Sequence, residues 1–98
     1  GRIKMKITEM NKKVNDLGYR LEINRIDSDA YEDYNRVLIF SDNEPFSIAT
    51  IFKEDGKEPK IKSDDSRLIK LINEFAKTPY RQRGFDDNQT LIEVPIRR

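Results

Sequence analysis

The sequence contains no cysteine, no histidine and no tryptophan among its 98 residues. Without cysteine there is no disulfide and no thiol chemistry, which fits a reducing compartment, and we expect the bacterial cytoplasm. Without cysteine and histidine, the usual zinc ligands and the commonest general base are both missing. The chain also lacks a Walker sequence and a Gly-x-Gly-x-x-Gly sequence. We therefore expect no enzymatic activity, no cofactor and no metal.

Long apolar runs are also missing. The longest is VLIF, residues 37–40, which is too short to cross a membrane, so we expect no membrane partner. No basic segment followed by an apolar stretch marks a signal peptide. Met5 has the position of a native initiator behind residues 1–4, which we expect to be an added segment or disordered.

The chain is long enough for one modest core, and we expect a single domain over residues 1–98. Charged residues make up 38% of it and almost cancel, at a formal net charge of +1. The charges are nevertheless unevenly spread, because residues 27–44 carry six carboxylates against one arginine. Residues 1–20 and 57–83 are both basic, so an acidic middle lies between two basic stretches.

Two stretches have the spacing of amphipathic helices. Ile7, Met10 and Val14 recur at helical intervals before Gly18, and Thr8 is a suitable N-cap. Residues 68–75 repeat the pattern between the capping run Ser63-Asp64-Asp65 and the stop signal Thr78-Pro79. Alternating or β-branched stretches indicate strands between and after them. The predicted elements are helix 8–17, strands 19–24, 36–40, 46–54 and 57–62, helix 64–77 and an edge strand at 90–96.

Two helices with one apolar face each must bury those faces against something. The economical solution is to pack both on the same side of one sheet. We therefore predict an α+β fold: a two-layer sandwich with an antiparallel sheet of three to five strands and two helices on one face, in the order αβββ(β)αβ.

The acidic segment before the second strand invites a calcium interpretation, which fails. An EF-hand beginning at Asp27 would need glycine at position six and glutamate at position twelve, where Glu32 and Leu38 stand. The same segment reads better as a protein contact, because tyrosines among carboxylates suit a basic groove. The alternative is a solvated loop whose tyrosines cover its own backbone. The predicted contact residues are Asp27, Asp29, Tyr31, Glu32, Asp33 and Tyr34.

The basic stretch suggests a second interpretation, a nucleic-acid-binding module. Guanidinium groups mixed with aromatic rings are suited to holding phosphates and stacking on bases. The residues of this alternative are Tyr80, Arg81, Arg83, Phe85, Lys60 and Lys62. The order of elements resembles the double-stranded RNA-binding domain. That family, however, grips phosphate at the start of its second helix, where this chain has KSDDSR, and two aspartates there would repel a phosphate.

The stretch LIKLINEFAKTPYRQR resembles a segment of small, mostly uncharacterised proteins encoded by phages and prophages of Gram-positive bacteria. The start MKITEMNKKVNDLGYRLEI is also similar to theirs. The resemblance covers about a third of the chain, implies an accessory phage origin and indicates no catalytic residue. The matching positions are Leu68, Leu71, Glu74, Phe75 (usually tyrosine), Ala76, Thr78, Pro79 and Arg83.

Three hypotheses follow. The first is a non-enzymatic phage or prophage protein that binds a host protein and inhibits a defence nuclease, by analogy of architecture with some anti-CRISPR proteins. The second is the nucleic-acid-binding module based on residues 57–83. The third is a small structural or assembly protein that associates through a strand edge at 57–62 or 90–96. The sequence leaves the oligomeric state open.

Overall fold

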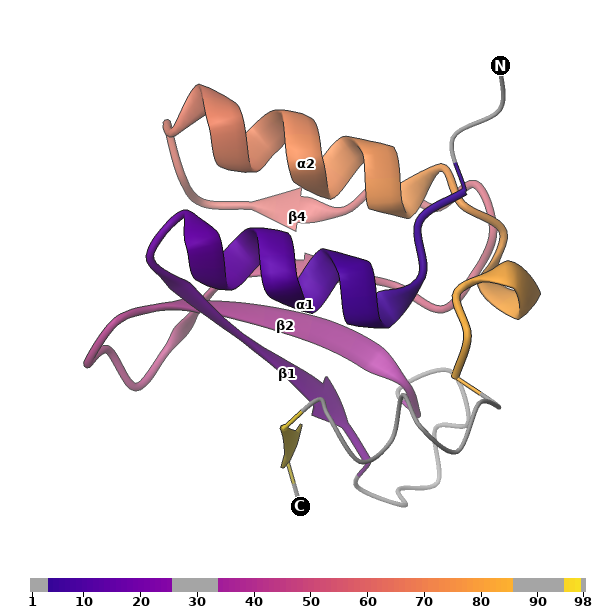
Figure 1. Cartoon of the computed structure of the whole chain (residues 1–98), viewed down its shortest axis with the longest axis horizontal. Coiled ribbons are helices and arrows are strands. Elements are labelled where there is room, and N and C mark those ends of the chain that lie inside the picture. Colours follow the sequence, from indigo (N-terminus) through magenta and orange to yellow (C-terminus); the bar gives the residue numbers. More distant parts are fainter. Residues whose placement is uncertain (1–3, 26–33, 86–94, 98) are drawn as a thin grey trace.

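The computed structural model describes residues 4–25, 34–85 and 95–97, and it contains two α-helices and the strands of one sheet. This confirms the predicted α+β class and the order of elements (Figure 1). In chain order the elements are α1 (Ile7–Asp16), β1 (Tyr19–Asn24), β2 (Arg36–Ser41), β3 (Ser47–Ile51), β4 (Lys60–Ile61), α2 (Ser66–Ala76), the 3₁₀-helix η2 (Tyr80–Gln82) and β5 (Ile96–Arg97).

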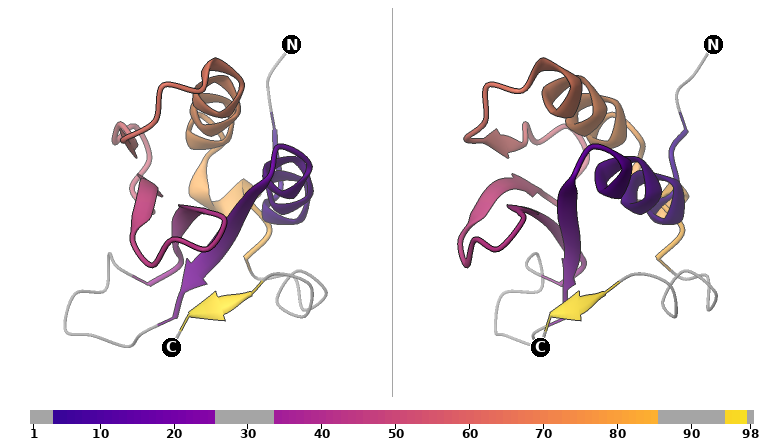
Figure 2. Two further views of the ribbon diagram at one scale, coloured as in Figure 1. Left: turned by 90° about the vertical axis from the view of Figure 1, so that its left-hand side faces the viewer. Right: turned by 60° about the vertical axis from the view of Figure 1, so that its left-hand side comes forward.

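The strands lie side by side in the order β4-β3-β2-β1-β5. The first four strands of the chain pair antiparallel with their neighbours, as predicted, whereas β5 pairs parallel with β1. Strands β4 and β5 are therefore the two edges of the sheet. Both helices lie on one side of it (Figure 2).

Alternation along the strands separates the two faces of the sheet. Two rows of apolar side chains cross the three central strands on the face turned toward the helices: Leu21, Ile39 and Ala49, then Ile23, Val37 and Ile51. The helices complete this core with their own apolar stripes, chiefly Ile7, Met10, Val14, Leu68, Ile72 and Phe75. The spacing in the sequence predicted these helix faces because buried positions recur every three or four residues.

Helix α1 begins differently from the prediction. Thr8 does not cap it: the N-cap is Lys6, which makes no side-chain hydrogen bond to the helix. The backbone N–H of Ile7 instead donates to the carbonyl oxygen of Arg83 at 2.7 Å. One of the N–H groups that a helix leaves unpaired at its start is thus satisfied by a residue 76 positions away, which local sequence could not reveal.

Helix α2 begins as expected, at a capping aspartate. Asp65 accepts a hydrogen bond from the backbone N–H of Arg67 at 3.0 Å and another from the Tyr19 hydroxyl at 2.7 Å. The hydrogen bond from Tyr19, followed by those from the Arg67 guanidinium and backbone N–H, lowers the pKa of Asp65 from 3.8 to about 2. The bond to Asp65 also raises the pKa of Tyr19. The cap therefore fixes α2 to the start of β1.

This cap makes a testable prediction for acid stability. Because the folded-state pKa of Asp65 lies below its ordinary value of 3.8, the ionised carboxylate stabilises the fold above that pH. The contribution is lost as the pH falls from about 4 toward 2. We expect the melting temperature of the Asp65→Asn variant to fall less over this range than that of the wild type. Asp64→Asn, an exposed neighbour, is the control and should follow the wild type. Parallel curves for all three proteins would contradict the assignment.

Candidate functional site

Arg83 is not on the surface, which corrects its assignment as a nucleic-acid contact. Only 1% of the residue is exposed. Its guanidinium donates to the carbonyl oxygens of Thr78 at 2.8 Å, Phe52 at 2.8 Å and Ala76 at 3.1 Å. It also lies 5.0 Å from the centre of the Phe75 ring. Burial lowers the pKa of Arg83 from its ordinary value, although the group stays charged.

The aromatic residues of the same stretch are also part of the structure. Phe85 is buried in the core, so it is not available to stack on a base. The Tyr80 ring stacks on Phe85 with 5.4 Å between centroids, and its hydroxyl accepts a hydrogen bond from Asn35 at 2.6 Å. The Tyr80 backbone N–H donates to Asp55 at 2.7 Å. Of the predicted nucleic-acid contacts, Arg81, Lys60 and Lys62 are exposed.

A different basic surface emerges from the tertiary structure, on the face of the sheet without helices. Here each of four cations lies over a phenylalanine ring, and we call this surface the open face. Arg20 lies 4.7 Å from the centre of Phe40, its direct cross-strand partner. Three more cations surround the Phe52 ring at 4.2–5.9 Å: Lys57, Arg36 and Lys60. Of these residues, Lys57 and Lys60 belong to the predicted basic segment 57–83, whereas Arg20 and Arg36 were not predicted as contacts. The sequence did indicate that Arg20 lies on this face, because successive residues of a strand point to opposite faces and its neighbour Leu21 is apolar and buried.

The connection between β2 and β3 presents a second surface. Every residue from 42 to 46 is exposed, and we call these five residues the tip. Phe46 is 81% exposed, and it is the one exposed large hydrophobic side chain in the described parts of the chain. The tip also carries Asp42 and Glu44, so an apolar ring stands among carboxylates. From the sequence, residues 42–45 were assigned to a turn and Phe46 to the start of the strand predicted over 46–54, whereas β3 begins at Ser47 and Phe46 is exposed.

The predicted acidic contact falls mostly outside the described residues. Asp27, Asp29, Tyr31, Glu32 and Asp33 lie there, and the assignment stays a prediction. Tyr34 is described and half-buried. Its hydroxyl accepts a hydrogen bond from Arg25 at 2.8 Å, and that guanidinium lies 5.0 Å from the centre of its ring. Part of the Tyr34 side chain therefore contacts Arg25 of the same chain and is covered by it.

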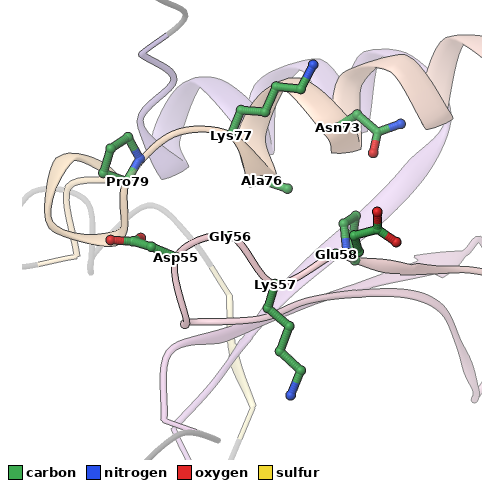
Figure 3. Close-up of a pocket in the computed structure, with 9 residues that line it drawn as sticks. Asp55, Gly56, Lys57, Glu58, Asn73, Ala76, Lys77 and Pro79 are labelled. Atoms are coloured by element: carbon green, nitrogen blue, oxygen red, sulfur yellow. The ribbon is translucent and has the colours of Figure 1, made fainter.

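A hollow of about 570 Å³ lies between the turn after β3 and the end of α2 (Figure 3). Small residues form much of its lining, including Gly56, Pro59 and Ala76. The side chains of Lys57 and Lys77 point away from each other, on opposite sides of the hollow (Figure 3). Asp55 is engaged by the Tyr80 N–H. Charged groups do not converge here as they would around a reacting substrate.

Acidic side chains do not gather into a metal site in the described parts of the chain, where no group of three or more could hold an ion. The helices described are also too short and polar to cross a membrane. The strand edge at 57–62 suits assembly poorly. The register turns the backbone N–H groups of Lys60 and Lys62 toward β3. The backbone groups that would face an added strand are therefore those of Pro59 and Ile61. Proline has no N–H to donate to an added strand.

Comparisons with models of known families, with curated proteins and with solved structures find no significant match to this chain.

Proposed function

We propose that this chain is a non-enzymatic protein that acts by binding a protein of a bacterial host, with the tip, residues 42–46, as a principal contact. The observation that supports it is the 81% exposure of Phe46. A phenyl ring exposed to water offers a large apolar area to a partner. Burying that ring completely contributes about 1.5–3 kcal/mol of binding free energy. Aromatic side chains of this kind are frequent among the dominant contacts of protein interfaces.

The charges on the tip indicate the chemistry of the partner. Asp42 and Glu44 stand on either side of Asn43, whose φ of 65° is a left-handed conformation that asparagine tolerates. The backbone N–H of Glu44 donates to the Ser41 carbonyl at 3.2 Å, so the turn is closed. An exposed ring within an acidic turn fits an apolar pocket rimmed by lysine or arginine. Opposite charges would steer the encounter and raise the association rate.

The host target is proposed to be a defence nuclease, because a nuclease has the basic groove that this chemistry requires. The proposal also rests on the resemblance to phage and prophage proteins and on the architecture shared with some anti-CRISPR proteins. The acidic segment with Asp29 and Asp33 is proposed as a second contact on the same partner.

The experiment is an affinity capture from host lysate treated with nuclease, followed by measurement of affinity for the protein identified. We expect Phe46→Ala to weaken binding about 30-fold, which corresponds to about 2 kcal/mol. Phe46→Tyr preserves the ring and should retain most of the affinity. Because the ring is exposed, both variants should melt within a few degrees of the wild type.

Two charge variants separate the acidic contacts. Asp42→Lys with Glu44→Lys should slow association if the tip meets a basic rim, and Asp29→Lys with Asp33→Lys tests the acidic segment in the same way. Glu9→Lys on α1 and Glu58→Lys supply a matched change of charge elsewhere on the surface. Unchanged affinity for Phe46→Ala would remove the tip from the interface. Unchanged association for both charge variants would remove the basic rim from the proposal.

A further inference from the structure

We propose that the open face of the sheet binds the phosphate backbone of nucleic acid, independently of the contact proposed for the tip. The cations concerned are Arg20, Arg36, Lys57 and Lys60, which the fold brings to one face of the sheet from three segments of the chain: β1, β2, and the turn after β3 with β4.

The phenylalanine rings beneath them fix where these charges lie. A cation over an aromatic ring is attracted by the negative face of the ring, which restricts an otherwise flexible side chain. Arg20 is held over Phe40 and also donates to Glu22 at 2.9 Å. Positioned cations lose less conformational freedom when an anion binds than free lysines or arginines do. The cations of the open face are therefore preorganised for binding an anion, unlike those of an ordinary charged surface.

Around Phe52 the positive charge is concentrated. Lys57, Arg36 and Lys60 all lie within 5.9 Å of its centroid, so no two of these groups can be separated by more than twice that distance. Like charges this close repel one another in the free protein. Glu54 offsets part of the repulsion through its ion pair with Lys57 at 3.6 Å. An anion placed among the three cations would reduce the repulsion among them further.

The extent of the open face favours a polymer over a small anion. The cations range from β1 to β4, three inter-strand spacings of about 4.8 Å each, and a single phosphate cannot contact them all. A chain of phosphates crossing the strands can. Arginine and lysine are also the side chains that supply most protein contacts to nucleic-acid backbones.

The burial of the rings distinguishes between kinds of partner. Phe40 is 1% exposed and Phe52 is 6% exposed, so neither ring can stack on a base. Recognition would then depend on phosphates, with little preference for sequence. The same burial disfavours an acidic protein as the partner, because stable protein interfaces need an apolar anchor at their centre. Among the residues that the structure describes, the exposed phenyl ring is at the tip and not on the open face.

The test measures fluorescence anisotropy of labelled 20-nucleotide single-stranded DNA and RNA at several salt concentrations. Four phosphate contacts predict a slope of log K against log salt of about −2.8, or roughly 300-fold weaker binding at 200 mM than at 25 mM salt. Replacing two contacts, in Lys57→Gln with Lys60→Gln, should reduce that slope by about 1.4. Both lysines are exposed, so the variant is expected to fold.

The control is Lys12→Gln with Lys70→Gln, which makes the same change of charge on the two helices. It should leave the slope close to that of the wild type. Absence of binding at 25 mM salt would overturn the proposal, and so would equal losses in both double variants, since net charge alone would then explain the affinity. Competition by poly-glutamate as strong as that by unlabelled DNA would show an acidic polypeptide to be the better ligand and would overturn it too.

Discussion

Arg83→Met is expected to cost about 3–5 kcal/mol of the free energy of unfolding. Methionine preserves much of the buried stem but offers no donor. The three carbonyl oxygens that the guanidinium now satisfies would be left in the interior with no donor from this side chain. The total free energy of unfolding of a folded protein is about 5–15 kcal/mol, so a large share of the stability depends on this one side chain.

The position of Arg83 explains why the expected effect is so large. The carbonyls of Ala76 and Thr78 belong to the end of α2, where the helix macrodipole also favours a cation. The carbonyl of Phe52 belongs to the chain leaving β3. The backbone oxygen of Arg83 accepts the first N–H of α1. One residue thus joins both helices and the sheet.

The measurement is thermal and urea unfolding followed by circular dichroism. A loss of this size should lower the melting temperature by at least about 12 °C. Arg83→Lys should also be strongly destabilised, because a single ammonium group on a flexible stem does not reproduce the planar set of donors. The control is Arg81→Met, an exposed position two residues earlier, where we expect a change within about 0.5 kcal/mol. Equal stability of the Arg81 and Arg83 variants would refute the role given to Arg83.

Phe75→Ala is expected to cost a similar amount, about 3–5 kcal/mol. Phe75 is completely buried in the core and supplies the ring that lies beside the Arg83 guanidinium. Alanine would leave a cavity under α2 and would remove that ring. Phe46→Ala is the matched control, because the same atoms are removed from a side chain that is 81% exposed. It should change stability by no more than about 0.5 kcal/mol.

A double-mutant cycle separates the two contributions of Phe75. If its ring stabilises the buried cation, the cost of Phe75→Ala should be smaller in the Arg83→Met background than in the wild type. Contacting residues of this kind typically couple by about 0.5–3 kcal/mol. Strict additivity would mean that the ring acts through packing alone. Equal destabilisation by Phe75→Ala and Phe46→Ala would contradict the burial on which the prediction depends.

The positions that suggested a resemblance to phage proteins from the sequence are largely those that build α2 and its end. Leu68, Leu71 and Phe75 pack in the core. Thr78 is buried, and its hydroxyl accepts the backbone N–H of Met5 at 3.0 Å. Arg83 closes the helix end. In this chain these positions therefore terminate and anchor a helix.

Local sequence determined the elements of this protein and its fold class. Helical spacing, strand alternation and the capping aspartate act over a few residues, so α1, α2, β1 and β2 were predicted within about two residues of their bounds. The edge strand β4 is shorter than predicted, Lys60–Ile61 in place of 57–62, because pairing with β3 decides its length. The start of α1 could not be predicted, since the carbonyl oxygen that accepts the N–H of Ile7 belongs to Arg83, far away in the sequence.

Only the tertiary structure decided which charged residues are available to a partner. Arg81 and Arg83 stand two positions apart in one basic stretch, yet one is exposed and the other lies in the core. Arg20 and Arg36 are far in the sequence from Lys57 and Lys60, yet all four lie on the open face. The physical reason is that charge is a property of a single residue, whereas desolvation and proximity depend on how the helices and strands pack together.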